Sequence, residues 1–212
     1  MTWTLDTTLD DALQAKFAGL NSPPAIQAFL DETPYSTADF NRCPLRVLQD
    51  GVANCMDGAL LAAAALRRLG WPPLIVDMLP EPGTDDDHIL AIYKRNGCYG
   101  AVAKSNFSCL RSREPVYRSL RELVMSYFDG YYNLQGQKTL RGYTRPVRLS
   151  AFDRLNWEVS DAGIEAIERH LYTLRPISVL APEMAAGLSP MDPLSYRSGL
   201  LGSNPDGLFK TD

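Results

Sequence analysis

A long apolar helix constrains what this chain can fold into. Residues 59–66 are an unbroken run of alanine and leucine, and Gly70 follows Arg67 and Arg68. Alanine and leucine are strong helix formers and glycine favours a helix C-terminus, so the pattern predicts a helix over residues 55–70. Because the run is apolar on every side, we expect this helix at the centre of the fold. It is too short for a membrane span, which needs about 20 apolar residues.

The composition excludes several classes of function. The 212 residues carry a net charge of -4. A protein that binds nucleic acid usually has a broad basic face, so no nucleic-acid partner is expected. Four cysteines without a CxxC pair, together with two histidines, lack the spacing of a structural zinc site, and no metal or cofactor is predicted. The N-terminus lacks the basic and apolar regions of a signal peptide. We therefore expect a cytoplasmic protein with reduced thiols and no membrane partner; its oligomeric state is not readable from the sequence.

Around the central helix the sequence predicts other helices and a small antiparallel sheet. Helices are expected over residues 5–19, 23–30 and 160–174, in short turns within 36–50, and after Pro115. Strands are expected over 74–79, 88–94 and 98–103, with a hairpin turn at Asn96 and Gly97, and a further extended segment over 138–149. The fold class is therefore α+β. Periodicity fades after Arg175, so we expect a domain over residues 1–175 and an extended arm over 176–212.

Cys55 is the strongest candidate for chemistry. It begins the predicted central helix, where unpaired N–H groups and the helix dipole stabilise a thiolate. Nucleophilic catalysis by a thiol also needs a base and a group that orients the base. His88 begins the predicted strand over residues 88–94, which can pack beside this helix. His170 lies in the predicted helix over residues 160–174, on a face that is expected to be exposed to solvent.

The orienting group is expected from the strand that returns after the hairpin. Asn106 follows that strand and would come back to the level of His88. Asp86 and Asp87 remain open as alternatives, although they are close to His88 in sequence. A structural role is open for each of these residues: a buried thiol for Cys55, a backbone-bonded histidine for His88, and a turn residue for Asn106.

The segments that carry these residues resemble the transglutaminase-like superfamily, whose members share a papain-like core. The resemblance covers residues 40–110 and rests on three pieces: Asn54 to Ala59 with Leu66 to Gly70, Asp87 to Ala91, and Gly97 to Tyr99 with Lys104 to Asn106. It implies a nucleophile helix packed on a small antiparallel sheet, extra flanking helices, and a Cys-His-Asn(Asp) triad of Cys55, His88 and Asn106. It also implies an oxyanion-hole role for Gln49, next to the backbone N–H of Cys55.

Two hypotheses about function follow. The first is a thiol-dependent acyl-transfer enzyme, a cysteine protease, amidase or transglutaminase acting on a peptide, protein or small amide. The second is a catalytically silent module that binds peptides or proteins, favoured because the superfamily usually has Asp where this chain has Asn106. A Cys55 sulfur within hydrogen-bond reach of a His88 nitrogen would distinguish the enzyme from the module. An acetyltransferase of the arylamine type is a weaker alternative, because no Arg-Gly-Gly segment precedes Cys55.

An acidic stretch lies just before His88. Asp77, Glu81, Asp85, Asp86 and Asp87 follow one another without a lysine or arginine between them. We interpret the stretch as a solvated loop without the spacing of a calcium-binding hand. Its charge is expected to raise the pKa of His88 and so to favour a thiolate–imidazolium pair.

Overall fold

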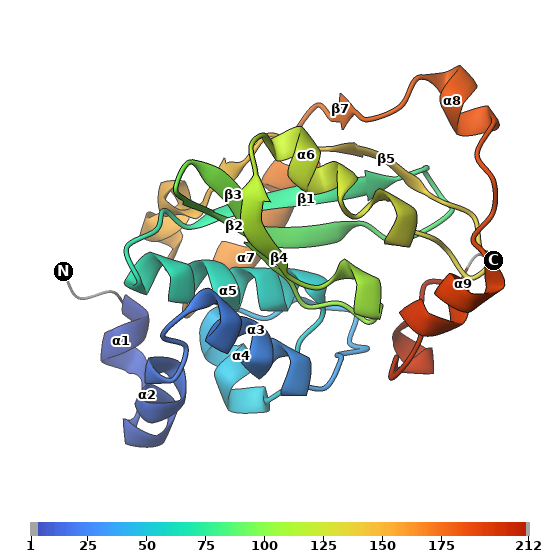
Figure 1. Ribbon diagram of the computed structural model, residues 1–212. Helices are drawn as coiled ribbons and strands as arrows, with labels where there is room; N and C mark the ends of the chain where they lie inside the picture. The colour runs from blue at the N-terminus through green and yellow to red at the C-terminus, as the bar shows by residue number, and fades with distance from the viewer. Residues whose placement is uncertain (1–3, 211–212) are drawn as a thin grey trace.

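The computed structural model describes residues 4–210 and shows one antiparallel sheet between two layers (Figure 1). Its strands are β1 Leu74–Pro80, β2 His88–Arg95, β3 Cys98–Val102, β4 Arg113–Tyr117, β5 Leu140–Tyr143, β6 Val147–Arg148 and β7 Ile177–Ser178. The spatial order is β4-β3-β2-β1-β5-β7, and β6 also pairs with β1. The predicted α+β class with an antiparallel sheet is confirmed.

Nine α-helices accompany the sheet within residues 4–210. They are α1 Thr4–Thr8, α2 Asp11–Ala18, α3 Pro23–Glu32, α4 Pro44–Asp50, α5 Cys55–Arg68, α6 Leu120–Met125, α7 Asp161–Leu171, α8 Pro182–Ala186 and α9 Pro193–Gly199. Four short 3-10 helices add to them: η1 Ser108–Leu110, η2 Phe128–Gly130, η3 Leu149–Leu155 and η4 Pro205–Gly207. None of the helices described is both long enough and apolar enough to cross a membrane.

The helix α5 forms where the sequence predicts it, and its first turn explains why. Asn54 accepts a hydrogen bond from the Asp57 N–H, and Asp57 accepts one from the Asn54 N–H, so the two residues form a capping box. Asp57 also accepts a 2.6 Å hydrogen bond from the backbone N–H of Arg42. Every residue from Met56 to Leu66 is buried. The start of α5 is therefore fixed both by its own cap and by the preceding segment.

Two apolar clusters sandwich the sheet. One contains α5 with its neighbours α3, α4 and α7, together with Ile89, Ala91 and Tyr93 of β2 (Figure 1). The other contains Leu90 and Ile92 of the same strand together with α6 and the tyrosines that follow it. Successive residues of β2 thus point to opposite layers, and odd-numbered ones face α5.

Two local predictions need correction. The expected helix over residues 5–19 is two helices, because Asp10 caps a new helix at Asp11. The segment after Pro115 is not helical: it belongs to β4, which pairs with β3, and the helix α6 starts only at Leu120. The strand and hairpin predictions are confirmed, with Asn96 and Gly97 both at positive φ.

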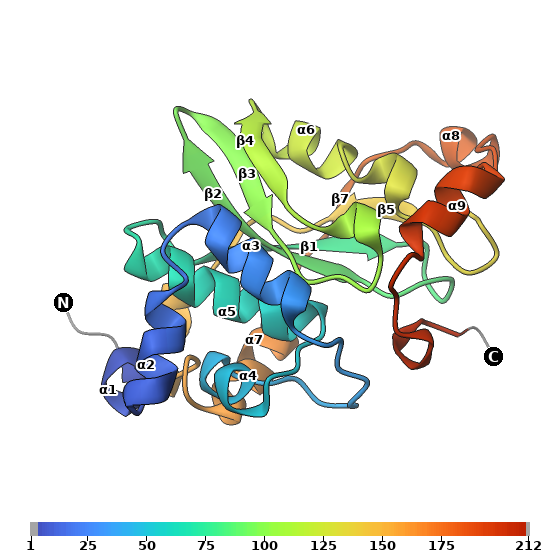
Figure 2. The same cartoon turned by 60° about the horizontal axis from the view of Figure 1, so that its bottom comes forward.

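The C-terminal segment is more ordered than the predicted extended arm. β7 pairs with β5, and α8, α9 and η4 follow it. From α9 onward the chain runs down one end of the molecule (Figure 2). The sequence does not reveal this order, because the helices are short and the segment is rich in proline and glycine. The end of the segment therefore lies against the body of the fold.

We expect Gly58→Ala to destabilise the protein. A Cβ at Gly58 would lie 2.3 Å from the Cβ of Lys104, whose side chain is buried between α5 and the end of β3. Overpacking of this kind costs about 1–3 kcal/mol, so thermal unfolding should lower the melting temperature by about 3–10 °C. Gly187→Ala is the control, because the nearest atom there is 3.7 Å away. Equal melting temperatures for the two variants would contradict the close approach.

Candidate active site

The predicted site lies at the N-terminus of α5. Cys55 is half-buried and lines a cavity of about 320 Å³. Its thiol donates a long contact of 4.0 Å to the backbone carbonyl of Asp87. Beside it stand Tyr35, Met56 and Ile89, and the other walls come from the loop at residues 36–41, Asn54, Asp86 and Asp87, α7, and the C-terminal residues 206–209. The structure therefore places Cys55 in a cavity, as a nucleophile or a binding residue requires.

His88 does not pair with Cys55. It stands on β2 between Asp87 and Ile89, and its ring points to the layer opposite α5, where Nε2 donates a 2.8 Å hydrogen bond to the Leu110 carbonyl. Burial lowers the pKa of His88 to about 4, against the increase expected from the acidic stretch. The ring is neutral at pH 7 and already holds a backbone partner. No hydrogen bond joins His88 to Cys55, although both residues and Asn106 line a second, smaller cavity of about 40 Å³.

Asp87 occupies the position facing Cys55 that the histidine was expected to take. Burial first, and then the charges of Asp87 and Asp86, raise the pKa of the Cys55 thiol. Burial, with these carboxylates adding to it, outweighs the favourable effect of the helix N-terminus. The thiol is therefore protonated at neutral pH, the opposite of an activated nucleophile.

Asn106 holds the C-terminal segment and does not orient His88. Its side chain donates to the Asn204 carbonyl at 2.8 Å and accepts from the Asn204 N–H at 2.7 Å. Three residues further along the tail, Gly207 packs so closely on Tyr35 that a Cβ would lie 2.7 Å from the ring. The expected third member of a triad is thus an anchor for the segment that borders the cavity.

Gln49 also lies away from the cavity. It is exposed near the end of α4 and is not among the residues that line the space around Cys55. The role in an oxyanion hole implied by the resemblance therefore has no geometric basis. The residue that borders Cys55 on this side is Tyr35, and burial raises the pKa of its phenol, with the Cys55 thiol adding to the effect.

The cavity is strongly acidic. Asp86, Asp87, Glu168 and Asp206 line it, and within residues 4–210 no lysine or arginine does. Burial raises the pKa of Asp87 to about 6, and the neighbouring charges of Asp86 and Glu168 contribute. The acidic stretch predicted as a solvated loop therefore forms part of the cavity wall.

A second carboxyl lies behind this wall. Asp77 on β1 pairs in register with Ile89 and is buried, and its Oδ1 has no hydrogen-bond partner. Burial, helped by the charge of Asp87, raises the pKa of Asp77 to about 8. The charge of Asp87 thus helps to keep Asp77 protonated, and the acids beside Cys55 disfavour a thiolate.

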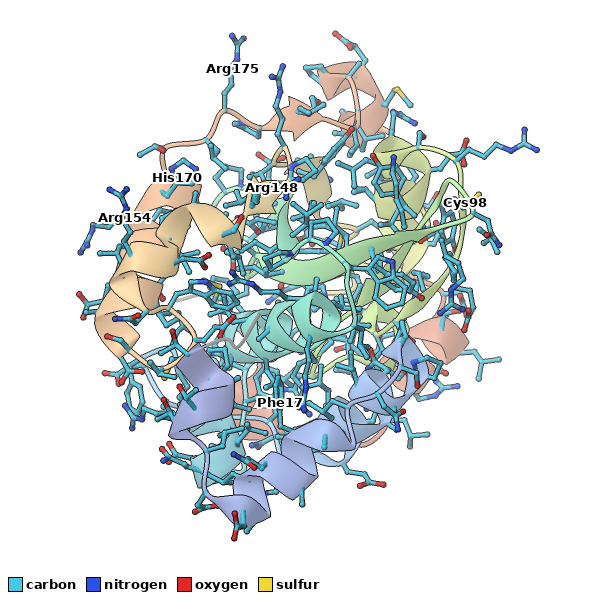
Figure 3. The ribbon with its side chains drawn as sticks, turned by 90° about the vertical axis from the view of Figure 1, so that its left-hand side faces the viewer. Phe17, Cys98, Arg148, Arg154, His170 and Arg175 are labelled. Atoms are coloured by element: carbon cyan, nitrogen blue, oxygen red, sulfur yellow. The ribbon has the colours of Figure 1, made fainter. Side chains whose placement is uncertain are left out.

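The remaining candidates lie elsewhere. His170 is exposed on α7 against Phe152, and Figure 3 shows it and Cys98 near opposite sides of the molecule. All four cysteines are free. In the described part of the chain no group of three or more His, Cys, Asp and Glu side chains is arranged to hold a metal ion.

Sequence reasoning missed the roles of Asp77, Asp87 and Tyr35. The segment from Ile89 to Tyr93 is apolar throughout, so it does not reveal whether its odd-numbered or its even-numbered residues face the central helix. Neighbouring residues of a strand face opposite sides of the sheet, so an assignment that is wrong by one position exchanges the two faces. Here it places Asp87 instead of His88 on the side of the central helix. The one available signal was the run of acidic residues itself, placed directly before the strand.

Comparisons with known proteins add a distant likeness of fold. No protein-family model and no curated protein matches the chain. Solved structures of LapG from Legionella pneumophila align with a TM-score of 0.36: one at 14% identity over 47% of this chain and 68% of LapG, an EGTA-treated form at 14% over 48% and 66%, and a calcium-bound form at 15% over 48% and 68%. A likeness of this size supports no statement about activity or ligand.

We expect Asp77→Asn to stabilise the protein increasingly as the pH rises from 4 to 7. The unfolded Asp ionises near pH 3.9 whereas the folded carboxyl stays protonated up to about pH 8. The wild type therefore loses up to about 1.4 kcal/mol of stability for each pH unit in this window, and the variant does not. Melting curves at both pH values check this, with exposed Asp129→Asn as the control. A difference that stays constant with pH would contradict the raised pKa.

We expect Asn106→Ala to loosen the C-terminal segment without unfolding the core. The variant loses both hydrogen bonds to Asn204, so amide hydrogen exchange over residues 204–209 should accelerate about tenfold. Exchange in α5 should stay unchanged. Asn21→Ala, at an exposed position just before the Ser22 cap of α3, is the control. Unchanged exchange in the tail would show that other contacts hold it.

Proposed function

We propose that this chain is a transglutaminase-like binding module, in which the cavity at Cys55 holds a peptide or protein segment without Cys–His catalysis. The single observation that carries the proposal is the orientation of His88, whose ring bonds the Leu110 carbonyl in the layer opposite α5. The likeness to the superfamily rests on the residues of the 40–110 segment described above.

The chemistry of acyl transfer explains why this observation matters. A thiol nucleophile needs a base within hydrogen-bond reach, and it is most effective as a thiolate. Here the group facing Cys55 is Asp87, and the surrounding carboxyls raise the thiol pKa. Asn106 is occupied by Asn204, so no residue of the expected triad supports another.

The cavity nonetheless has the features of a binding site. It is concave, and apolar side chains of Met56, Ile89 and Leu171 stand among its polar groups. Tyr172 borders it with a ring that is 85% exposed. Retention of the fold around a binding cleft accounts for these features without a reacting thiol.

Alkylation of Cys55 by iodoacetamide at a series of pH values tests the proposal. The rate should show a midpoint above the free-thiol value of about 8.5, and His88→Gln should leave it unchanged. Asp86→Asn should lower the midpoint, because it removes a carboxylate that disfavours the thiolate. Mass spectrometry of the peptide that contains Cys55 gives the rate, and circular dichroism checks the fold of each variant. A midpoint below about 8.5 that rises in His88→Gln would establish a Cys–His pair and favour the acyl-transfer enzyme instead.

A further inference from the structure

Residues 204–209 of the chain lie against the hollow that holds Cys55. Gly207 and Phe209 line both the larger cavity and the smaller one of about 40 Å³, and Cys55 lines both as well. Figure 2 shows this part of the chain as the red turn that follows α9. The segment is therefore a wall that the two cavities share.

Asn106 binds the main chain of this segment. Its amide group accepts a hydrogen bond from the Asn204 N–H at 2.7 Å and donates one to the Asn204 carbonyl at 2.8 Å. Asn106 is only 8% exposed with the segment in place, so both bonds are shielded from competing water. A side-chain amide offers one acceptor and one donor, which match the N–H and C=O of a peptide unit. The contact therefore recognises a backbone and not a particular side chain.

The segment forms a tight turn at this contact. The side chain of Asn204 accepts a hydrogen bond from the Asp206 N–H at 3.1 Å, and the Asn204 carbonyl accepts one from the Gly207 N–H at 3.1 Å. Pro205 fixes the backbone at the first position of η4. A turn that its own residues close loses little conformational entropy when it binds. The segment thus has the preorganisation of a good peptide ligand.

Tyr35 contacts the glycine that ends the turn. A Cβ added to Gly207 would lie 2.7 Å from the Tyr35 ring and 3.3 Å from the amide nitrogen of Asn106. The backbone of Gly207 does not have a positive φ, so this contact, and not the turn itself, requires glycine. Residues 34 and 36, on either side of the ring, pair with Ala53 through backbone hydrogen bonds of 3.1 and 3.0 Å just before α5. The ring is therefore a fixed wall that only a glycine can pass.

The segment itself is attached at its edges and not through the core. No residue from 200 to 210 is fully buried. Leu208 and Phe209 belong to neither of the two apolar clusters. Segments with few buried apolar contacts open at a low cost in free energy while the rest of a fold stays closed. The turn is therefore the part of this site that opens most easily.

We propose that the hollow between Tyr35 and Asn106 is a peptide-binding site for a turn of the type Asn-Pro-x-Gly in a partner protein, and that residues 204–209 occupy it as an internal ligand. This inference rests on the proposed function and names the kind of segment that the binding module recognises. Asn106 binds the backbone of the residue that begins the turn, and Tyr35 selects the glycine that ends it. Leu208 and Phe209 follow the turn along the wall of the larger cavity, so the partner carries apolar residues at these two positions.

A Gly207→Ala variant of the full chain tests the inference. The added Cβ should displace the internal ligand and leave Tyr35 and Asn106 in place. The probe is a fluorescently labelled peptide of residues 203–210, and anisotropy measures its binding. A tethered segment competes at an effective concentration on the order of millimolar, so the peptide should bind Gly207→Ala at least about tenfold more tightly than the wild type. Gly187→Ala, where the nearest atom is 3.7 Å from the added Cβ, should behave as the wild type does.

Two further arms test the individual contacts. A peptide with alanine in place of its glycine should bind Gly207→Ala at least about tenfold more weakly than the original peptide, because the Tyr35 ring excludes the added methyl group. Asn106→Ala, combined with Gly207→Ala, should weaken the original peptide about tenfold, because two hydrogen bonds are lost. Circular dichroism checks the fold of each variant.

Several outcomes would overturn the inference. They are equal binding of the original peptide to the wild type and to Gly207→Ala, no binding to either chain, and equal binding of the two peptides. Light scattering after size exclusion tests the other possible occupant, the same segment of a second copy. A dimer of the wild type that Gly207→Ala abolishes would overturn the assignment to a partner protein in favour of that copy.

The failure of the inference is distinguishable from the failure of the proposed function. Mass spectrometry of the peptide mixed with Gly207→Ala shows whether the peptide is cleaved or becomes attached to Cys55. A bound peptide that is cleaved or attached would refute the silent module and leave the recognition of the turn in place. An intact peptide that does not bind would refute the turn site alone.

Discussion

The packing of α5 on β2 is the contact on which the rest of the structure depends. Eleven consecutive residues of α5 are buried, and Ile89, Ala91 and Tyr93 supply the sheet side of the interface. Since side chains alternate along a strand, the choice of these odd-numbered residues as the apolar face also decides the residue that meets Cys55. That residue is Asp87, and His88 is turned into the second core. The orientation of β2 against α5 thus places a carboxylate at the site where an imidazole was expected.

The consequences for the electrostatics follow directly. A thiol at a helix N-terminus is normally stabilised as a thiolate, but carboxyls placed beside it reverse the preference. At Cys55 burial is the larger cause of the raised thiol pKa and Asp87 and Asp86 add to it, while Asp77 is a buried acid that stays protonated at neutral pH. A group of acids this close together costs folding energy. Functional sites are where proteins most often tolerate such a cost.

The tail gives the site its outer border. Asn106 fastens residue 204, and Gly207 fits against Tyr35, so the last described residues form one wall of the cavity. These contacts join residues at least 98 positions apart in the chain. The C-terminal segment therefore takes part in shaping the site, and a ligand entering the cavity meets residues from both ends of the sequence.

The sequence by itself determined the local elements and the position of the candidate cysteine. Strong helix formers, a capping residue at Asn54 and a hairpin turn at Asn96 act over a few residues, so α5, β2, β3 and the placement of Cys55 at a helix start could be predicted. Only the tertiary structure decided which face of β2 meets α5, because a strand buried on both sides carries no alternation to read. It also decided that Asn106 binds Asn204 and that Asp77 lies behind the cavity. Contacts between distant segments depend on how the elements pack, and no local pattern encodes them.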